Sequence, residues 1–261
     1  PYMIWPLGPL SSSVSKVFLH IGFGVDAYDA HHAILVPWLL LLFSALWCLA
    51  RPRLGRWPAV TALLVVACYP RFWAECHNNI KDIPSAALLT ATLALGMTAV
   101  ERQAWRRLLL AGVVWGLALA AKPNGLFLPF IGLAWLVAEL WRQRRAGRPL
   151  ARWFWPLLLA LPLVAVATML AVWPLLWVDF PTQFLVYLKS LMSRGYTGEA
   201  RWQLMPLINA VATMPLPVLL LVGVGLVSLV RQWRRRTWQP VHLLALAWLV
   251  IPVARVSLPG A

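Results

Sequence analysis

Long apolar stretches alternate with short polar ones along almost the whole chain. A helix needs roughly 20 mostly apolar residues to cross about 30 Å of hydrocarbon, so these stretches predict membrane spans. The predicted spans are 33–50, 57–69, 84–100, 108–121, 126–140, 153–177, 206–230 and 239–254. Several are short and must be flanked by interfacial residues or packed inside a bundle. The expected fold class is all-α: a polytopic transmembrane bundle of about eight membrane segments, with further helices in its extracytoplasmic loops.

Arginine is concentrated in every second polar loop of this pattern. The four arginine-rich loops hold 15 of the 23 basic residues, and the positive-inside rule assigns such loops to the cytoplasm. Their arginines are Arg51, Arg53, Arg56, Arg102, Arg106, Arg107, Arg142, Arg144, Arg145, Arg148, Arg152, Arg231, Arg234, Arg235 and Arg236. The intervening loops are then extracytoplasmic, including residues 1–32 and a long loop at 178–205.

The composition decides how this charge is interpreted. The chain is 61% hydrophobic and only 12% charged, whereas soluble domains hold about 45–50% apolar and about 25% charged residues. A net charge of +15 would indicate nucleic-acid binding in a soluble protein, and a disordered basic tail would lack the apolar content. The sequence therefore predicts an integral membrane protein with no nucleic-acid partner, whose charge mainly sets its orientation.

The two ends of the chain affect its expected domain organisation. We expect one membrane-embedded domain over 1–261, in which residues 1–32 form an outer loop with surface helices. An outer N-terminus normally needs an export signal, but this segment has no basic start and no small-residue cleavage site. The interpretation is a fragment of a longer polytopic protein, with a spanning helix before residue 1 and further chain after residue 261.

Ionisable residues are nearly absent from the middle of the apolar stretches but varied in the outer loops. Ion-coupled transporters keep such groups at mid-membrane, so the pattern disfavours a transporter. Three cysteines without paired spacing favour neither a disulfide framework nor a zinc site. The outer loops, which combine carboxylates, imidazoles, amides and lysines, are the candidate chemical surface.

The densest polar stretch of the outer loops is 75–82, directly before an apolar helix. Pro84 fits the first turn of that helix, which places Asp82 at or beside its N-cap. Asp82 then has two interpretations. It is either a helix cap beside a solvated loop, or part of an anion site that the outward helix N-terminus forms with Lys81.

A second outer turn, 122–125, precedes another apolar helix at the same depth. Lys122 can hold a phosphate there together with Lys81, or it can be an interfacial anchor whose ammonium reaches out to water. Asn124 is a weaker candidate in the same turn. Three further pairs of outer-loop residues are candidates. Arg194 and Tyr196 are candidate partners for a phosphate, and His31 and His32 either bind a metal or simply flank the membrane. Asp26 and Asp29 are interpreted as turn residues.

The motif HNNIKDIP, followed by a long apolar helix and then by GLALAAKPNGLFLPF, resembles the membrane-embedded C-type (GT-C) glycosyltransferases. The lineage is that of the protein O-mannosyltransferases and aminoarabinose transferases, called phospholipid-carrier-dependent glycosyltransferases. The commoner form of the first motif is NPKDIP, so Ile80 replaces a proline. DAYDAHHAILVP also resembles the stretch before a central helix in these proteins.

The resemblance implies transfer of a hexosyl or pentosyl group from a polyprenyl-phosphate donor to an acceptor on the extracytoplasmic face. It implies a catalytic role for Asp82, and contact of Lys81 and Lys122 with the donor phosphate. The substrate-binding residues that it implies are His77, Asn78, Asn79 and Asn124. In the family the principal base lies in the first outer loop, commonly in an Asp-Glu pair. No such pair occurs in this chain, so we expect it upstream and expect the fragment alone to be inactive.

Two alternatives use the same outer surface without transfer chemistry. One is a carrier or flippase for lipid-linked glycans, and the other is a non-catalytic membrane subunit of a cell-envelope complex. The expected location is the plasma membrane, the inner membrane of a bacterium by the family form, with the active site outside the cytoplasm. The sequence leaves open the sugar, the acceptor, the oligomeric state and any cofactor, including a divalent metal.

Overall fold

Helices make up almost the whole of the computed structural model, which describes residues 7–193 and 204–257. In chain order they are α1 (Leu7–Lys16), the π-helical turn η1 (Val17–Ile21), α2 (Ala27–His32), α3 (Leu35–Leu54), α4 (Arg56–Ala67), α5 (Pro70–Asn78), α6 (Asp82–Arg102), α7 (Trp105–Ala121), the 3₁₀ turn η2 (Pro123–Phe127), α8 (Leu128–Arg145), α9 (Phe154–Ala171), α10 (Leu175–Val178), α11 (Phe180–Ser193), α12 (Met205–Ala212), α13 (Leu216–Arg234) and α14 (Pro240–Ser257). None of the described residues forms a β-strand, which confirms the all-α prediction.

Five helices in the described part of the chain are long and apolar enough to cross a membrane. They are Ala27–Leu54, Asp82–Arg102, Pro123–Arg145, Phe154–Ala171 and Leu216–Arg234. A sixth span arises if Arg56–Ala67 and Pro70–His77, which are bent by 62° relative to each other, form one broken span. The structure therefore supports a membrane-spanning helical protein, but it does not confirm the predicted count of eight.

The differences from the predicted spans have local causes. The predicted segment 108–121 lies in α7, whose 17 residues rise only about 26 Å, which is short of a full crossing. The segment 239–254 coincides with the apolar part of α14, which is short for the same reason. The segment 206–230 is divided between α12 and α13, because Pro215 adopts extended backbone immediately before α13.

The chain divides into two compact units. The first comprises Pro1–Leu126 and Leu150–Tyr187, and the second comprises Phe127–Pro149 and Leu188–Ala261. In the second unit α8 packs against α14, which also contacts α12. That the whole chain forms a single membrane-embedded domain stays a prediction.

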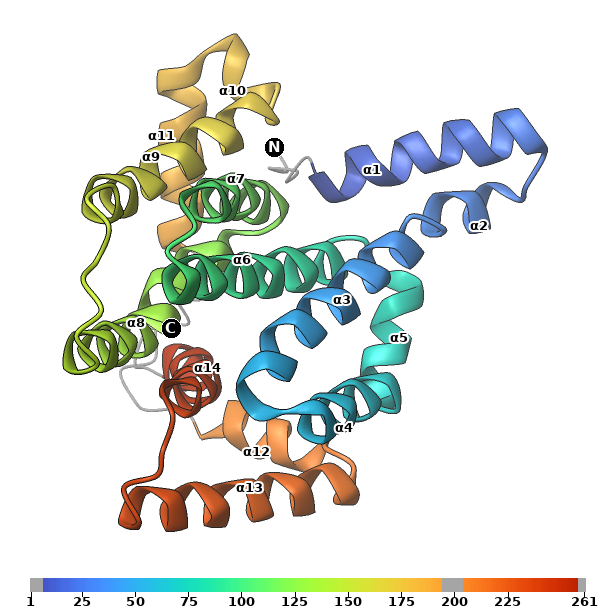
Figure 1. The fold of residues 1–261 in the computed structure, drawn as a ribbon. Coiled ribbons are helices and arrows are strands. Elements are labelled where there is room, and N and C mark those ends of the chain that lie inside the picture. The colour runs from blue at the N-terminus through green and yellow to red at the C-terminus, as the bar shows by residue number, and fades with distance from the viewer. Residues whose placement is uncertain (1–6, 194–203, 258–261) are drawn as a thin grey trace. The chain divides into compact units, whose positions relative to one another are not determined.

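Helix α6 is the central helix of the first unit. It packs against both α3 and α7, and α7 packs in turn against α9 (Figure 1). The apolar window of α6 is 72% buried, compared with 22% for Ala27–Leu54 and 17% for Phe154–Ala171. Protein therefore shelters α6, whereas α3 and α9 present most of their apolar surface outward, as helices facing lipid do.

The contact of α7 with α9 depends on two glycines one helical turn apart. A Cβ atom at Gly116 would lie 2.3 Å from the carbonyl oxygen of Ala165 and 2.5 Å from Thr168 Cβ. A Cβ atom at Gly112 would lie 2.9 Å from Leu161 Cδ2. The Gly-x-x-x-Gly spacing lets membrane helices approach until their backbones touch. The position of α7, and of the turn that follows it, is fixed by this close approach.

The segments predicted to form outer loops are themselves largely helical. Helices α1 and α2 pack together, and the Ser15 hydroxyl donates to the Ala30 carbonyl oxygen at 2.7 Å. In the segment 178–205, α11 covers Phe180–Ser193, while residues 194–203 lie outside the described part of the chain. The side of the membrane on which these segments lie stays a prediction.

Candidate functional site

An asparagine supplies the side-chain cap of α6, a role that one of the two interpretations gives to Asp82. Asn79 Oδ1 accepts hydrogen bonds from the backbone N–H groups of Asp82, at 2.9 Å, and Lys81, at 3.2 Å. A side-chain oxygen stabilises a helix start in this way because the first N–H groups have no partner within the helix. Asp82 is the first residue of α6, and Pro84 lies in the first turn as expected. The Asp82 carboxylate bonds side chains instead.

Three side chains gather around the Asp82 carboxylate. Asp82 Oδ1 forms an ion pair with Lys122 Nζ, and Oδ2 accepts a hydrogen bond from Asn79 Nδ2 at 2.8 Å. The same amide donates to Glu75 Oε2 at 2.7 Å, so Asn79 bridges two carboxylates. The Asp82 and Lys122 side chains are 41% and 33% exposed. We call Glu75, Asn79, Asp82 and Lys122 the carboxylate–lysine cluster, and it is accessible to a ligand.

The antiparallel packing of α6 and α7 brings Lys122 to Asp82, although 40 residues separate them in the sequence. Lys122 follows the last residue of α7 and precedes the turn η2. That turn is held by Trp115, whose Nε1 donates to the Gly125 carbonyl oxygen at 2.9 Å. Gly125 is buried, and a Cβ atom there would lie 2.9 Å from Leu119 Cδ2. A tightly packed turn therefore directs Lys122 toward the start of α6.

Apolar contacts fix the helix ends that carry the carboxylate–lysine cluster. Buried Leu88 of α6 packs with Ala118 and Ala121 at the end of α7. Ile83, next to Asp82, packs with Cys76 of α5. Packing between α5, α6 and α7, and not the ion pair alone, therefore sets the geometry of the cluster.

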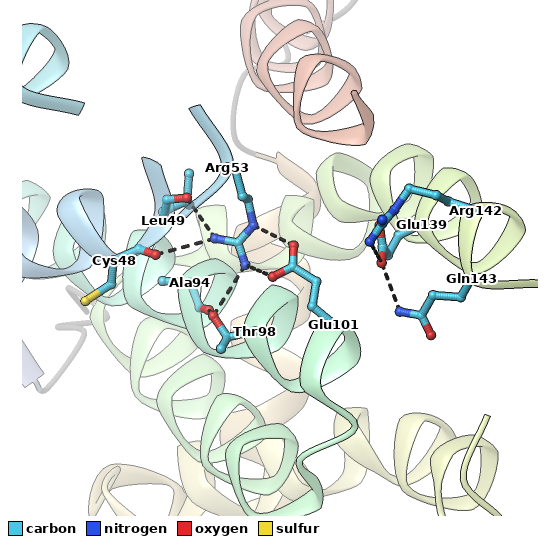
Figure 2. Close-up of polar contacts among 9 residues, drawn as sticks. All are labelled: Cys48, Leu49, Arg53, Ala94, Thr98, Glu101, Glu139, Arg142 and Gln143. Carbon is cyan, nitrogen blue, oxygen red and sulfur yellow. Dashed lines mark hydrogen bonds and ion pairs between the residues drawn. The ribbon is translucent and has the colours of Figure 1, made fainter. Parts of the chain in front are cut away.

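The opposite end of α6 carries a different ion pair (Figure 2). Arg53 of α3 forms a fork on Glu101, with Nε to Oε1 and Nη2 to Oε2 both at 2.7 Å. Arg53 also donates from Nη1 to the Leu49 carbonyl oxygen at 2.7 Å and from Nη2 to Thr98 Oγ1 at 3.3 Å. The Arg53 side chain is 6% exposed and that of Glu101 is 23% exposed. This pair joins α3 to α6 and leaves little capacity for a ligand.

The two ion pairs mark the two ends of α6. Asp82 begins this 21-residue helix and Glu101 is its penultimate residue. At 1.5 Å per residue the two carboxylates are about 28 Å apart along the axis. That length is close to the roughly 30 Å thickness of a hydrocarbon core. Helix α6 can therefore hold one ion pair at each surface of a bilayer.

Both ends of α6 lie within the region that a protein-family model matches. The family is described as dolichyl-phosphate-mannose-protein mannosyltransferase, and the match covers residues 16–176. The chain belongs to this family. It is therefore a glycosyltransferase of the C type and an integral membrane protein, which confirms the resemblance carried by HNNIKDIP. No curated protein and no solved structure matches the chain.

The other predicted site residues of this mannosyltransferase-family chain are not joined to the carboxylate–lysine cluster by their side chains. His77 is exposed on α5, and its Nδ1 is hydrogen-bonded to the Trp73 carbonyl oxygen at 2.7 Å. Lys81 and Asn124 are exposed in the turn before α6 and in η2. Among the described residues, no hydrogen bond or ion pair of these three side chains reaches the cluster; Lys81 contacts it only through its backbone N–H, which donates to Asn79 Oδ1. Asn78 ends α5, and its side chain lies outside the described residues.

Glu75 is the member of the cluster that the sequence interpretation did not single out. It lies four residues before Asn79, and α5 makes this interval one helical turn. The signal that could have found it is this spacing, since an acid one turn before a capping asparagine can accept the asparagine's free N–H.

The remaining polar candidates have local structural partners or are not described. Arg194 and Tyr196 lie outside the described residues. His32 Nδ1 is hydrogen-bonded to the Tyr28 carbonyl oxygen at 2.9 Å, and its ring lies against that of His31. Within residues 7–193 and 204–257, no group of three or more His, Cys, Asp or Glu side chains is placed to hold a metal ion.

Asp26, interpreted from the sequence as a turn residue, caps α2. Its Oδ1 accepts from the backbone N–H groups of Tyr28, at 2.9 Å, and Asp29, at 3.4 Å. These donors hold the pKa of Asp26 below its ordinary value, because they stabilise the ionised carboxylate. The role of Asp26 is therefore structural.

A buried carboxylate in the second unit is also fully occupied (Figure 2). Glu139 is 2% exposed and accepts from Arg142, through Nε at 2.8 Å and Nη2 at 2.7 Å. Gln143 Nε2 donates to the same carboxylate at 2.9 Å. All three side chains belong to α8, so this group stabilises one helix locally.

Proposed function

We propose that this chain transfers a sugar from a polyprenyl-phosphate-linked donor to an acceptor on the extracytoplasmic face of the membrane. The observation that carries the proposal is the partly exposed carboxylate–lysine cluster at the start of α6. It supplies a carboxylate and a cation side by side, inside the region matched by the family. The family description itself names a mannose linked to a lipid phosphate, which supports a lipid-linked donor.

The proposed orientation rests on the difference between the two ends of α6. Arg53, Glu101 and Arg102 lie at one end, next to two of the arginine-rich loops, and that end is proposed to face the cytoplasm. Asp82 and Lys122 lie at the other end, which would then face outward. The expected location is the plasma membrane, the inner membrane of a bacterium.

In the proposed reaction, the acceptor oxygen attacks the anomeric carbon of the sugar. The bond from that carbon to the phosphate oxygen breaks, and the phosphate keeps the bonding electron pair. The acceptor hydroxyl gives its proton to a carboxylate acting as a general base. Lys122 and Lys81 stabilise the charge that develops on the phosphate.

The ion pair suggests how the donor and the acceptor are coupled. Lys122 pairs with Asp82 in the structure, and a donor phosphate would compete for the same ammonium. When a phosphate binds Lys122, Asp82 Oδ1 becomes free to orient the acceptor hydroxyl, while Asp82 Oδ2 stays hydrogen-bonded to Asn79. The family resemblance assigns the principal base to an Asp-Glu pair that these 261 residues do not contain. We therefore propose Asp82 as the group that orients the acceptor.

The proposal is tested with Asp82→Asn and Lys81→Ala in the full-length protein, assayed for sugar transfer from a synthetic polyprenyl-phosphate sugar. Both variants should lose most of the transfer while their amounts in the membrane stay normal. Asp29→Asn and Lys189→Ala are the matched controls, because both residues lie outside the carboxylate–lysine cluster, and they should transfer normally. Wild-type turnover in both test variants would refute the assignment. Lipid flipping without any sugar transfer would favour a carrier instead.

A further inference from the structure

A groove of about 750 Å³ lies between α3 and α6, near the end of α6 that carries Glu101. Leu41 and Ala45 line it from α3, and Ala91, Ala94 and Leu95 line it from α6. These residues recur at three- and four-residue intervals, so each helix contributes one continuous apolar face. The middle of the groove is therefore a surface for hydrocarbon.

Three arginines from three helices line the same groove at its polar end. Arg51 comes from α3, Arg102 from α6 and Arg107 from α7, and all three are exposed. Glu101 also lines the groove, but the Arg53 fork neutralises its carboxylate. The polar end therefore keeps the charge of three guanidinium groups, which are suited to bind an oxygen anion such as a phosphate.

The length of the groove matches one leaflet of a bilayer. From Leu41 to Arg51 along α3 the rise is about 15 Å, which is half of the roughly 30 Å hydrocarbon core. From Ala91 to Arg102 along α6 the rise is similar, about 16 Å. The groove is apolar near the middle of both helices and cationic at their ends. A phospholipid of one leaflet has the same polarity over the same length.

We propose that this groove is a binding site for an anionic phospholipid, which places its phosphate among Arg51, Arg102 and Arg107 and an acyl chain along α3 and α6. The proposed phosphate position is separate from the proposed transfer site, because Asp82 lies about 30 Å from Arg102, at the other end of α6. Lipid bound here contacts both helices that the Arg53–Glu101 pair joins. By the proposed orientation the lipid belongs to the cytoplasmic leaflet, although its binding does not depend on that assignment.

The test uses the full-length protein in nanodiscs of phosphatidylcholine, titrated with fluorescent phosphatidylglycerol. Removing the three charges by Arg51→Gln, Arg102→Gln and Arg107→Gln should weaken binding on the order of 100-fold, since each basic residue near a membrane contributes about five-fold. The matched control replaces three exposed arginines of the second unit that do not line the groove, Arg231→Gln, Arg234→Gln and Arg235→Gln. It should bind phosphatidylglycerol within about two-fold of the wild-type protein.

A second variant separates the groove from simple surface charge. Ser44 is an exposed residue that lines the groove, so Ser44→Trp fills the apolar part and keeps every arginine. This variant should also lose the bound phosphatidylglycerol. Unchanged binding in Ser44→Trp, equal loss in the control triple variant, or equal binding of phosphatidylcholine would each overturn the proposal. Displacement by polyprenyl phosphate, but not by unlabelled phosphatidylglycerol, would assign the groove to the donor lipid and overturn it as well.

Discussion

The two ends of α6 carry the same kind of interaction with opposite properties. At the start of the helix, Asp82 shares its carboxylate between Lys122 and Asn79, and both partners of the ion pair are at least one third exposed. At the other end, Arg53 and Glu101 form a two-point fork with further bonds to Thr98 and to the Leu49 carbonyl oxygen. Asp82 and Lys122 can therefore exchange their partners for a ligand. Arg53 and Glu101 cannot do so without leaving a buried charge unpaired.

This difference predicts separate roles for the two ends of α6, sugar transfer at its start and stability at its other end. An exposed ion pair contributes little to stability, typically about 0–1 kcal/mol, so the pairing of Asp82 with Lys122 is of little structural value. A buried pair is costly to break from one side, because the remaining charge stays desolvated. We therefore expect substitutions at the start of α6 to reduce sugar transfer and substitutions at its end to reduce stability.

The largest effect is expected for Lys122→Ala. Lys122 is proposed to stabilise the departing phosphate, so its loss should lower transfer by roughly 10²–10³-fold, the usual effect of removing one such group. Thermal unfolding of the purified full-length protein should change little, because the ion pair is partly exposed. Lys122→Arg keeps the charge and should retain more transfer than Lys122→Ala. A large fall in the unfolding temperature with normal transfer would show that the start of α6 serves stability rather than transfer, and would contradict the comparison.

The next effect is expected for Glu101→Leu, at the other end. Arg53 would stay almost fully buried without its partner, which should destabilise the protein by about 3 kcal/mol. Transfer per folded molecule should stay close to normal. The double variant Arg53→Met with Glu101→Leu removes both charges and should recover most of the stability, as measured by thermal unfolding in detergent. A double variant as unstable as Glu101→Leu would show that the pair stabilises the fold by more than the mutual neutralisation of its two charges.

The spans of α3 and α6 are predictable from the sequence, because each is one long apolar stretch with polar residues near both ends. The count of eight spans is not predictable in the same way, because the apolar content of a stretch does not show where its helical backbone ends. Extended backbone at Pro215 divides one predicted segment. In another, α9 ends at Ala171, six residues before the predicted span ends at 177. In both segments the local backbone conformation, rather than the apolar content, determines where the helix ends.

Individual residues of the carboxylate–lysine cluster are predictable, but their mutual contacts are only partly so. Asp82 and Lys122 are found from two outward helix ends at the same depth. Of the two interpretations of Asp82, the helix cap falls to Asn79, because Asp82 is the first residue of α6 and itself donates its N–H to the capping oxygen. Glu75 is missed because the sequence pattern predicts no helix over residues 70–78, where the structure has α5.

A smaller effect is expected for Gly116→Ala, which tests whether α7 positions the lysine. A Cβ atom would lie 2.3 Å from the Ala165 carbonyl oxygen, so α7 must shift away from α9, at a cost of roughly 1–3 kcal/mol. Because Lys122 follows α7 directly, transfer should fall together with stability. Gly223→Ala is the control, since its Cβ meets nothing within 4 Å. Equal behaviour of the two variants in transfer and unfolding assays would contradict this role for α7.

The smallest effect concerns Asp26, an exposed carboxylate whose partners are backbone groups rather than a cation. Its pKa is lowered in the folded protein, chiefly by the N–H group of Tyr28, so folding favours the ionised form. The contribution of this cap is fully present above the ordinary pKa of an aspartate and is lost as the pH falls through the lower folded value.

Asp26→Ala should therefore lower the unfolding temperature slightly at neutral pH, and the difference from wild type should vanish in acid. Asp26→Asn keeps a capping oxygen without the charge and should retain much of the stability at neutral pH while losing the pH dependence. Unfolding curves recorded across the acid range distinguish these outcomes. A difference that grew as the pH fell would mean that the carboxylate is destabilising in the folded state.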